Sequence, residues 1–188
     1  RRIASVRAEL EPLVEMVQHK GASECNRAFS TNDEACGFEN VNPTAALCNG
    51  DGSGTGMNCT GRGDYVRNAL GVGMREEARL GVNPLRYGFI ASTDTHNSTP
   101  GNTSETTFPG HVGAQDDEPS ELLGANLAVF SPGGLAGVWA VENSRDAIFA
   151  ALQRRETFAT SGTRSLVRLF GGALDGVSCD APDLVARA

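Results

Sequence analysis

The stretch YGFIASTDTHN, residues 87–97, decides the fold that we expect for this chain. Residues 87–91 form a short apolar run between an Asn-Pro pair and a long polar segment, which is typical of a buried strand. Asp94 and His96 follow this run and are two residues apart, and in an extended chain such residues point the same way. A carboxylate beside an imidazole predicts ligands for a divalent metal ion. The alternative is a turn in which both side chains only hydrogen-bond the loop.

A second strand-like run, residues 13–18, also ends in a histidine. His19 follows it directly, and Glu24 comes close behind. In barrels and open parallel α/β sheets, sites are built at the carboxyl ends of the strands. A lone histidine after a strand is more often structural, but the repetition of the pattern at His96 favours a place for His19 in the same site.

Composition and charge narrow the class of partner. The chain has 188 residues, enough for one domain with its own core, and its net charge is −7 with a pI near 5.0. No basic block is present, so we expect no nucleic-acid partner. No apolar run is long enough to cross a bilayer, so we expect no membrane span.

Cysteine usage points to an oxidising compartment. Four cysteines are spaced almost evenly through a polar, loop-rich segment, and none forms a C-x-x-C pair; they are Cys25, Cys36, Cys48 and Cys59. Of the three possible pairings we favour Cys25 with Cys36 and Cys48 with Cys59, because short loops close at low entropic cost. Cys179 is left over, either free or bonded elsewhere. Two disulfides predict an exported protein, periplasmic or extracellular.

Helical and strand-like patterns alternate along the chain, which predicts an α/β fold with mainly parallel strands. The expected strands are residues 13–18, 87–92, 135–140, 157–160 and 166–170. The expected helices are residues 1–11, with Ile3, Val6 and Leu10 on one face, residues 64–80, capped by Asp64 and stopped by Gly81, and residues 145–154, capped by Ser144 with Ile148, Phe149 and Leu152 inward.

Two further residues are candidates for the site. Residues 97–121 form a polar loop that contains His111 and follows the Asp-His pair directly, so the loop can fold over the site as a lid; the alternative is an ordinary surface loop. Arg164 follows a turn, where a guanidinium can hold a substrate anion, although arginine in such a place is more often part of an ordinary ion pair.

Several long phrases of the sequence closely resemble the bacterial domain-of-unknown-function family 3604. The phrases are EPLVEMVQHKGASEC, YGFIASTDTHN, PGGLAGVWAVENSRDAIFAALQRRETFATSG and VRLFGG, and the resemblance runs from about Leu10 to Gly172. This family looks like a branch of the PHP (polymerase and histidinol phosphatase) superfamily of metal-dependent phosphoesterases.

The resemblance implies a distorted (β/α)7 barrel with divalent metals at the carboxyl ends of its strands. Asp94 and His96 match the superfamily's last metal motif, D-x-H, and His19 matches an earlier strand-end ligand position. The opening H-x-H motif is missing, so the chain resembles the later part of a barrel, with residues 26–63 as a Cys-rich insert. A fragment that carries the first strands and the H-x-H is then an expected partner.

The expected activity is hydrolysis of a small-molecule ester, most specifically a phosphoester, by the intact parent protein. His19, Asp94 and His96 are the expected ligands of one or more zinc, manganese or iron ions, because mixed nitrogen and oxygen ligands suit these metals. Arg164, Glu24 and His111 are candidate catalytic residues. The alternative is a non-catalytic binding module on a degenerate PHP-like barrel, which the missing H-x-H favours.

Overall fold

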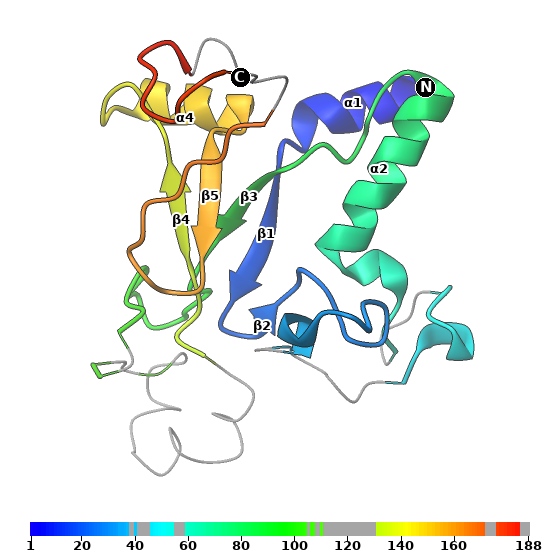
Figure 1. Ribbon diagram of the computed structural model, residues 1–188. Helices are drawn as coiled ribbons and strands as arrows, with labels where there is room; N and C mark the ends of the chain where they lie inside the picture. The colour runs from blue at the N-terminus through cyan, green and yellow to red at the C-terminus, as the bar shows by residue number, and fades with distance from the viewer. Residues whose placement is uncertain are drawn as a thin grey trace.

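The computed structural model describes residues 1–37, 40, 46–54, 59–104, 106–107, 110, 131–171 and 176–184. Its helices and strands confirm the α/β class (Figure 1). In chain order they are α1 (Arg2–Leu10), β1 (Leu13–Gln18), β2 (Gly21–Ala22), α2 (Val66–Leu80), β3 (Gly88–Ala91), β4 (Leu135–Val138), α4 (Arg145–Arg154) and β5 (Thr157–Thr160). Three short 3-10 helices lie between β2 and α2, at Glu34–Gly37, Cys48–Gly50 and Arg62–Asp64.

The strands form two small sheets, with orders β2-β1-β3 and β4-β5. β1 and β3 pair in parallel, with Leu13 opposite Gly88 and Val17 opposite Ala91. β2 pairs antiparallel with β1, and β4 pairs antiparallel with β5. The expectation of mainly parallel pairing is therefore wrong for the described strands, because the chain returns from β4 through α4 directly to a neighbouring antiparallel strand.

The two sheets stand side by side, with β5 next to β3 (Figure 1). Gly88 permits this approach: a Cβ at that position would lie 2.9 Å from Oγ1 of Thr157 at the start of β5. The arrows of β1, β3 and β5 point to the same edge of this wall of strands. The carboxyl ends of three strands, and the residues that enter β4, therefore meet at one edge.

The expected strand over residues 166–170 is not formed. This segment lies across Trp139, whose Nε1 donates to the carbonyl of Val167 at 3.0 Å, while the guanidinium of Arg168 stacks 5.0 Å from the Trp139 ring centre. Leu166 and Leu169 are 80% and 92% exposed. Their alternating apolar pattern predicts a strand, but no described strand pairs with the segment.

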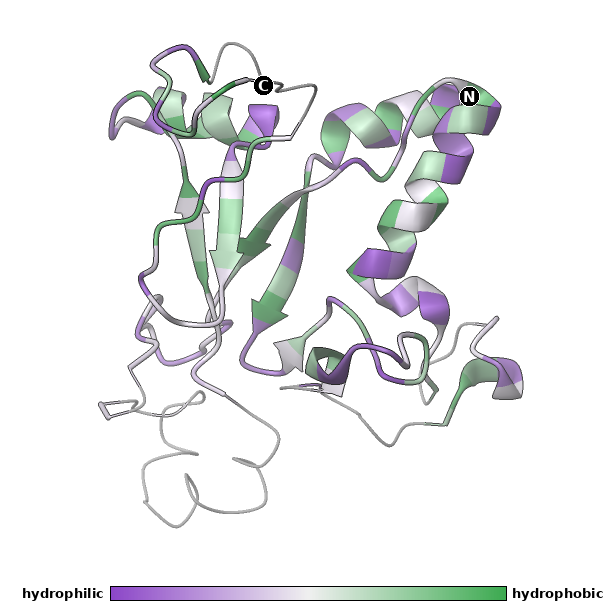
Figure 2. Ribbon diagram, viewed as in Figure 1, coloured by the Kyte–Doolittle hydropathy of each residue, from purple (hydrophilic) through white to green (hydrophobic). Residues whose placement is uncertain are grey.

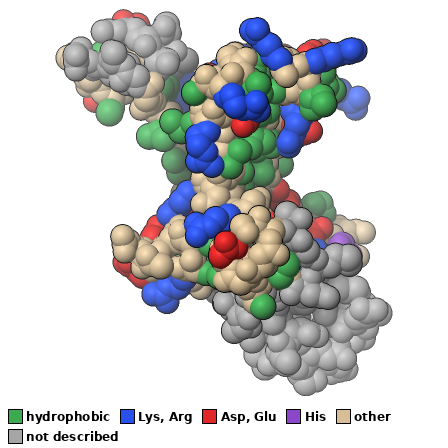
Figure 3. Space-filling view, turned by 90° about the vertical axis from the view of Figure 1, so that its right-hand side faces the viewer, with side chains coloured by type: hydrophobic (Ala, Val, Ile, Leu, Met, Phe, Trp, Pro, Cys, Tyr) green, Lys and Arg blue, Asp and Glu red, His purple; other side chains and the backbone are tan. Residues whose placement is uncertain are grey.

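The helices form close to their expected bounds, but part of their apolar surface faces solvent. Ile3 and Leu10 of α1 are 78% and 71% exposed, and Met74 of α2 is 69% exposed. Hydropathy colouring shows green residues on several turns of both helices (Figure 2), and apolar side chains lie among arginines on the α1 and α2 side of the molecule (Figure 3). Phe149 of α4, expected inward, is also exposed.

The helix ends follow the expected chemistry in two of three places. Ser144 caps α4, since its hydroxyl accepts a hydrogen bond from the backbone N–H of Ala147, and Gly81 ends α2 in the left-handed conformation with φ 74°. At the start of α2 the N-cap is Tyr65 and not Asp64. The Asp64 carboxylate instead accepts from the backbone N–H of Gly61 at 2.8 Å and holds the turn that precedes the helix.

The described strands do not close a barrel. Few large side chains are fully buried among the described residues, and a groove of about 810 Å³ runs between β3, β5 and the segment that crosses Trp139. The groove is lined by apolar side chains that include Met16, Phe89 and Phe158. The described residues therefore cover the wall of strands only in part.

Both expected disulfides are confirmed. Cys25 is bonded to Cys36, and Cys48 is bonded to Cys59. Cys179 is free and exposed. Each bridge closes a short loop in the polar segment before α2, as the loop-entropy argument predicted.

Candidate metal centre

The ends of the parallel strands β1 and β3 bring His19 and Asp94 together. His19 is the first residue after β1, and Asp94 comes three residues after the end of β3. His19 Nε2 lies 3.2 Å from Oδ2 of Asp94. The residue is 3% exposed, so its imidazole is held within the protein and not at its surface.

His96 approaches the same carboxylate from the solvent side. Its Nε2 lies 3.6 Å from Oδ1 of Asp94, and its ring centre lies 5.7 Å from that of His19. The His96 side chain is 57% exposed, whereas that of Asp94 is 33% exposed. The Asp94 carboxylate therefore lies between a buried and an accessible imidazole, one near each of its oxygens.

The backbone brings Asp94 and His96 together in a way that strand periodicity does not explain. β3 ends at Ala91, and Asp94 adopts the left-handed conformation with φ 49°. The argument that residues i and i+2 of an extended chain point the same way does not apply there, because the chain is already turning. Their side chains meet because this turn redirects the chain at Asp94.

Lys20 is the nearest cation to Asp94. Its Nζ donates a hydrogen bond to Oδ2 of Asp94 at 2.8 Å. This hydrogen bond lowers the pKa of the Asp94 carboxyl below its ordinary value, against the opposing effect of burial, and the charges of Lys20, His19 and His96 act in the same direction. Asp94 is therefore held ionised, which is the form that ligates a metal ion.

The backbone that leads into β4 packs against one side of the group formed by His19, Asp94 and His96. The backbone N–H of Ser131 donates to the carbonyl of His19 at 2.9 Å, and that of Gly134 donates to the carbonyl of Ser92 at 2.7 Å. A Cβ on Gly133 would lie 2.7 Å from the Cα of Thr93 and 3.1 Å from the backbone N of His19. Only a residue without a side chain permits this approach, and φ at Gly133 is +83°.

A polar pocket of about 480 Å³ lies next to this side of the group, and Arg164 borders it. A Cβ on Gly162, which also lines the pocket, would lie 3.3 Å from the carbonyl oxygen of Gly133, so the pocket adjoins the turn that enters β4. The remaining lining is the loop at residues 100–104, and Arg164 Nη2 donates to the carbonyl of Gly101 at 3.4 Å.

The family model described as "Protein of unknown function (DUF3604)" matches residues 1–188. The chain belongs to the DUF3604 family. No curated protein and no solved structure matches it.

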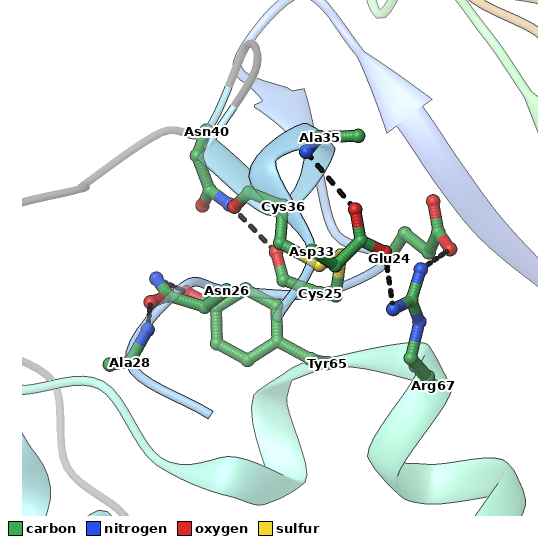
Figure 4. The surroundings of a disulfide bond; sticks show 10 residues. All are labelled: Glu24, Cys25, Asn26, Ala28, Asp33, Ala35, Cys36, Asn40, Tyr65 and Arg67. Atoms are coloured by element: carbon green, nitrogen blue, oxygen red, sulfur yellow. Dashed lines mark hydrogen bonds and ion pairs between the residues drawn. A yellow bond between two sulfur atoms is a disulfide. The ribbon is translucent and has the colours of Figure 1, made fainter. Parts of the chain in front are cut away.

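Glu24 of this DUF3604 chain lies in a different set of contacts. Its carboxylate pairs with Arg67 of α2, which also pairs with Asp33 at 2.8 Å (Figure 4). These residues surround the Cys25–Cys36 bridge, and Asn40 donates to the carbonyl of Cys25 at 2.7 Å. The described contacts of Glu24 thus join the stapled loop to α2, and its role in the site stays a prediction.

His111 and most of the expected lid loop fall outside the described residues. Within the described part, Asn97 Oδ1 accepts hydrogen bonds from the hydroxyls of Thr95 and Thr99, and Asn97 Nδ2 donates to the carbonyl of Gly110 at 2.6 Å. Asn97 therefore organises the chain directly after His96. The lid role of residues 97–121 is untested.

The DUF3604 chain holds a second set of ligand-type atoms. Single ligand atoms of Cys25, Asp33 and Cys36 all lie within 4.8 Å of one another. The two sulfurs are bonded to each other, whereas a metal binds thiolates. This group can therefore hold a metal only after the bridge is reduced.

Sequence reasoning did not single out Lys20, although a signal was present. Lys20 is the only lysine in the chain, among 16 lysines and arginines, and it directly follows His19. Strand periodicity places residues 19 and 20 on opposite faces of an extended chain. The chain turns after β1, so both side chains reach Asp94.

Proposed function

We propose that this protein is a metal-dependent hydrolase and that its substrate is a phosphoester. The observation that carries the proposal is the Asp94 carboxylate, which lies 3.2 Å and 3.6 Å from the imidazoles of His19 and His96. These side chains come from the carboxyl ends of neighbouring parallel strands, where α/β folds build their sites.

The donor set fits a divalent metal of the zinc, manganese or iron type. Two imidazole nitrogens and a carboxylate are ligands that these ions share. Asp94 already attracts a cation, since the Lys20 ammonium lies 2.8 Å from it. When bound, such an ion polarises an ester oxygen and lowers the pKa of a coordinated water toward neutrality.

The protein's own residues would position the ligands. Burial of His19 fixes one imidazole, while the exposed His96 stands on the side from which a substrate can enter. Each imidazole lies near a different oxygen of Asp94, so this carboxylate would hold an ion together with either histidine.

Arg164 is the proposed anchor for the phosphate. It borders the polar pocket beside the turn that enters β4, and its guanidinium has five N–H donors, more than the contact with Gly101 uses. A guanidinium matches the geometry of phosphate oxygens and would stabilise their charge in the transition state. Glu24 and His111 stay second-rank candidates for orienting a ligand or moving a proton.

The PHP-like barrel is part of this proposal. The open wall of described strands and its apolar groove suit completion by further strands, and an H-x-H motif on them would add ligands to the three present. The parent protein would then hold the complete site.

The proposed compartment is the bacterial periplasm or the extracellular space. Two disulfides are compatible with an exported protein. In the described part of the chain, no helix is both long and apolar enough to span a membrane.

The test is the metal content and turnover of the Asp94→Asn variant of the intact parent protein. Asparagine tolerates the left-handed conformation of Asp94, so the variant removes the charge and keeps the backbone. We expect loss of bound zinc, manganese or iron by elemental analysis, and a reduction of phosphomonoester or phosphodiester hydrolysis by at least about a hundredfold.

Asp33→Asn is the matched control, because it makes the same chemical change beside the Cys25–Cys36 bridge. It should leave metal content and turnover unchanged. If Asp94→Asn keeps both metal and turnover, the assignment of the centre is wrong. A wild-type protein that binds no metal and hydrolyses no ester would favour the binding-module alternative.

A further inference from the structure

The ammonium of Lys20 occupies the position from which a cation would reach Asp94. Its Nζ lies 2.8 Å from Oδ2, the same oxygen that lies 3.2 Å from His19 Nε2. The backbone N–H of Lys20 donates to Oε1 of Gln18 at 2.7 Å, which holds the turn after β1. A metal ion shared by His19 and Asp94 would compete with this ammonium for the same carboxylate oxygen.

Lys20 has room to move when it is displaced. Its side chain is 47% exposed, whereas that of His19 is 4% exposed. A lysine on a flexible four-carbon stem can release one oxygen and bind another without backbone movement. An ammonium at the rim of a cationic centre is suited to the non-bridging oxygens of an anionic ester.

We propose that Lys20 is a further functional residue of this centre, which neutralises Asp94 while no metal is bound and binds the substrate's anionic oxygens once a metal has taken Asp94. This inference rests on the proposed function. Lys20 would then weaken the binding of the metal and strengthen the binding of the anion. A lysine with only a structural role would not change these two affinities in opposite directions.

The experiment compares wild type with Lys20→Met, which keeps the stem of the side chain and removes its charge. Binding of Mn²⁺ or Zn²⁺ alone, measured by equilibrium dialysis, should become tighter by about two- to fivefold, the range for loss of a competing, partly exposed ion pair. Binding of inorganic phosphate to the metal-loaded protein should become weaker by about tenfold, as expected for loss of a charge-assisted hydrogen bond.

Arg154→Met is the matched control, since Arg154 is a basic residue that pairs with Glu156 at 2.8 Å outside the centre. It should change neither affinity. If Lys20→Met weakens metal binding, or leaves either affinity unchanged, the proposal for Lys20 is overturned while the metal centre stands. If neither the intact parent protein nor its Lys20→Met variant binds metal, the proposed function fails, and this proposal fails with it.

Discussion

At the scale of single residues, the unusual backbone conformation of Asp94 brings together the side chains of the candidate metal centre. Its φ of 49° places it in a region that few L-residues adopt, and aspartate and asparagine adopt it more readily than most. In that conformation its carboxylate contacts His19, Lys20 and His96 at once. Replacement by alanine would combine backbone strain with loss of charge, whereas asparagine isolates the charge.

The metal affinity should fall on acidification. An imidazole ligates a metal only when it is neutral, and histidines ordinarily titrate near pH 6.5. The hydrogen bond from Lys20 lowers the pKa of Asp94, so protonation of this carboxyl does not explain a loss of affinity near neutral pH. We expect Mn²⁺ affinity, measured by dialysis, to fall by at least about tenfold between pH 7.5 and pH 5.5.

His96→Gln provides the control for this pH dependence. The variant should bind metal more weakly at pH 7.5 and lose less affinity on acidification, because protons then compete with the metal at one imidazole fewer. A wild-type affinity that does not change between pH 7.5 and pH 5.5 would exclude imidazole ligation.

At the scale of elements, the turn that enters β4 supports the centre from the side. Gly133 lies against the backbone of Thr93 and His19 with φ +83°. Gly133→Ala should therefore lower both stability and metal affinity, by strain of about 1 kcal/mol from the positive φ and by a further displacement of the turn. Urea denaturation and metal dialysis measure the two effects.

Gly50→Ala is the matched comparison for this variant. Gly50 also has a positive φ, +77°, but a Cβ there would meet no atom within 4 Å. Gly50→Ala should lower stability through a similar backbone strain and leave metal affinity unchanged. Equal metal affinity in both variants would show that close approach at Gly133 does not position the centre.

Sequence reasoning succeeded for elements that local chemistry specifies. The bounds of β1 and β5 match the expected runs, and Ser144 and Gly81 end their helices as predicted. It failed where the outcome depends on neighbours: residues 166–170 have a strand pattern but cross Trp139 instead of pairing. Asp94, His96 and His19 were singled out by their places after strands, whereas Lys20 was missed because only the turn after β1 brings it to Asp94.

At the scale of the whole molecule, ion pairs join segments that are far apart in sequence. Arg67 of α2 holds Glu24 and Asp33, and Lys20 holds Asp94. Hydrogen bonds from these cations lower the pKa of Asp33 and Asp94, and those from Arg79 and Arg154 do the same for Glu76 and Glu156. Most of these groups are partly exposed, so each contribution is small.

The pKa values of these carboxyls are all lowered, and this predicts how stability depends on pH. A carboxyl whose folded pKa is lowered stabilises the fold above its unfolded pKa, about 4, and this contribution is lost as the pH falls through the folded value. The urea midpoint should therefore be similar at pH 7 and pH 5 and fall below pH 4. A urea midpoint that is higher at pH 3 than at pH 4 would contradict these ion pairs.

Both disulfides lie within the first third of the chain, and each joins cysteines with a sequence separation of 11. A ribosome adds about 5–20 residues each second, amino end first. Cys59 therefore emerges before β3 does, and both bridges can form on a chain whose first strand still lacks its parallel partner. Oxidation during translocation would thus cross-link the segment before α2 before the later strands pair. The later steps of folding would then not include a search for the correct cysteine partners.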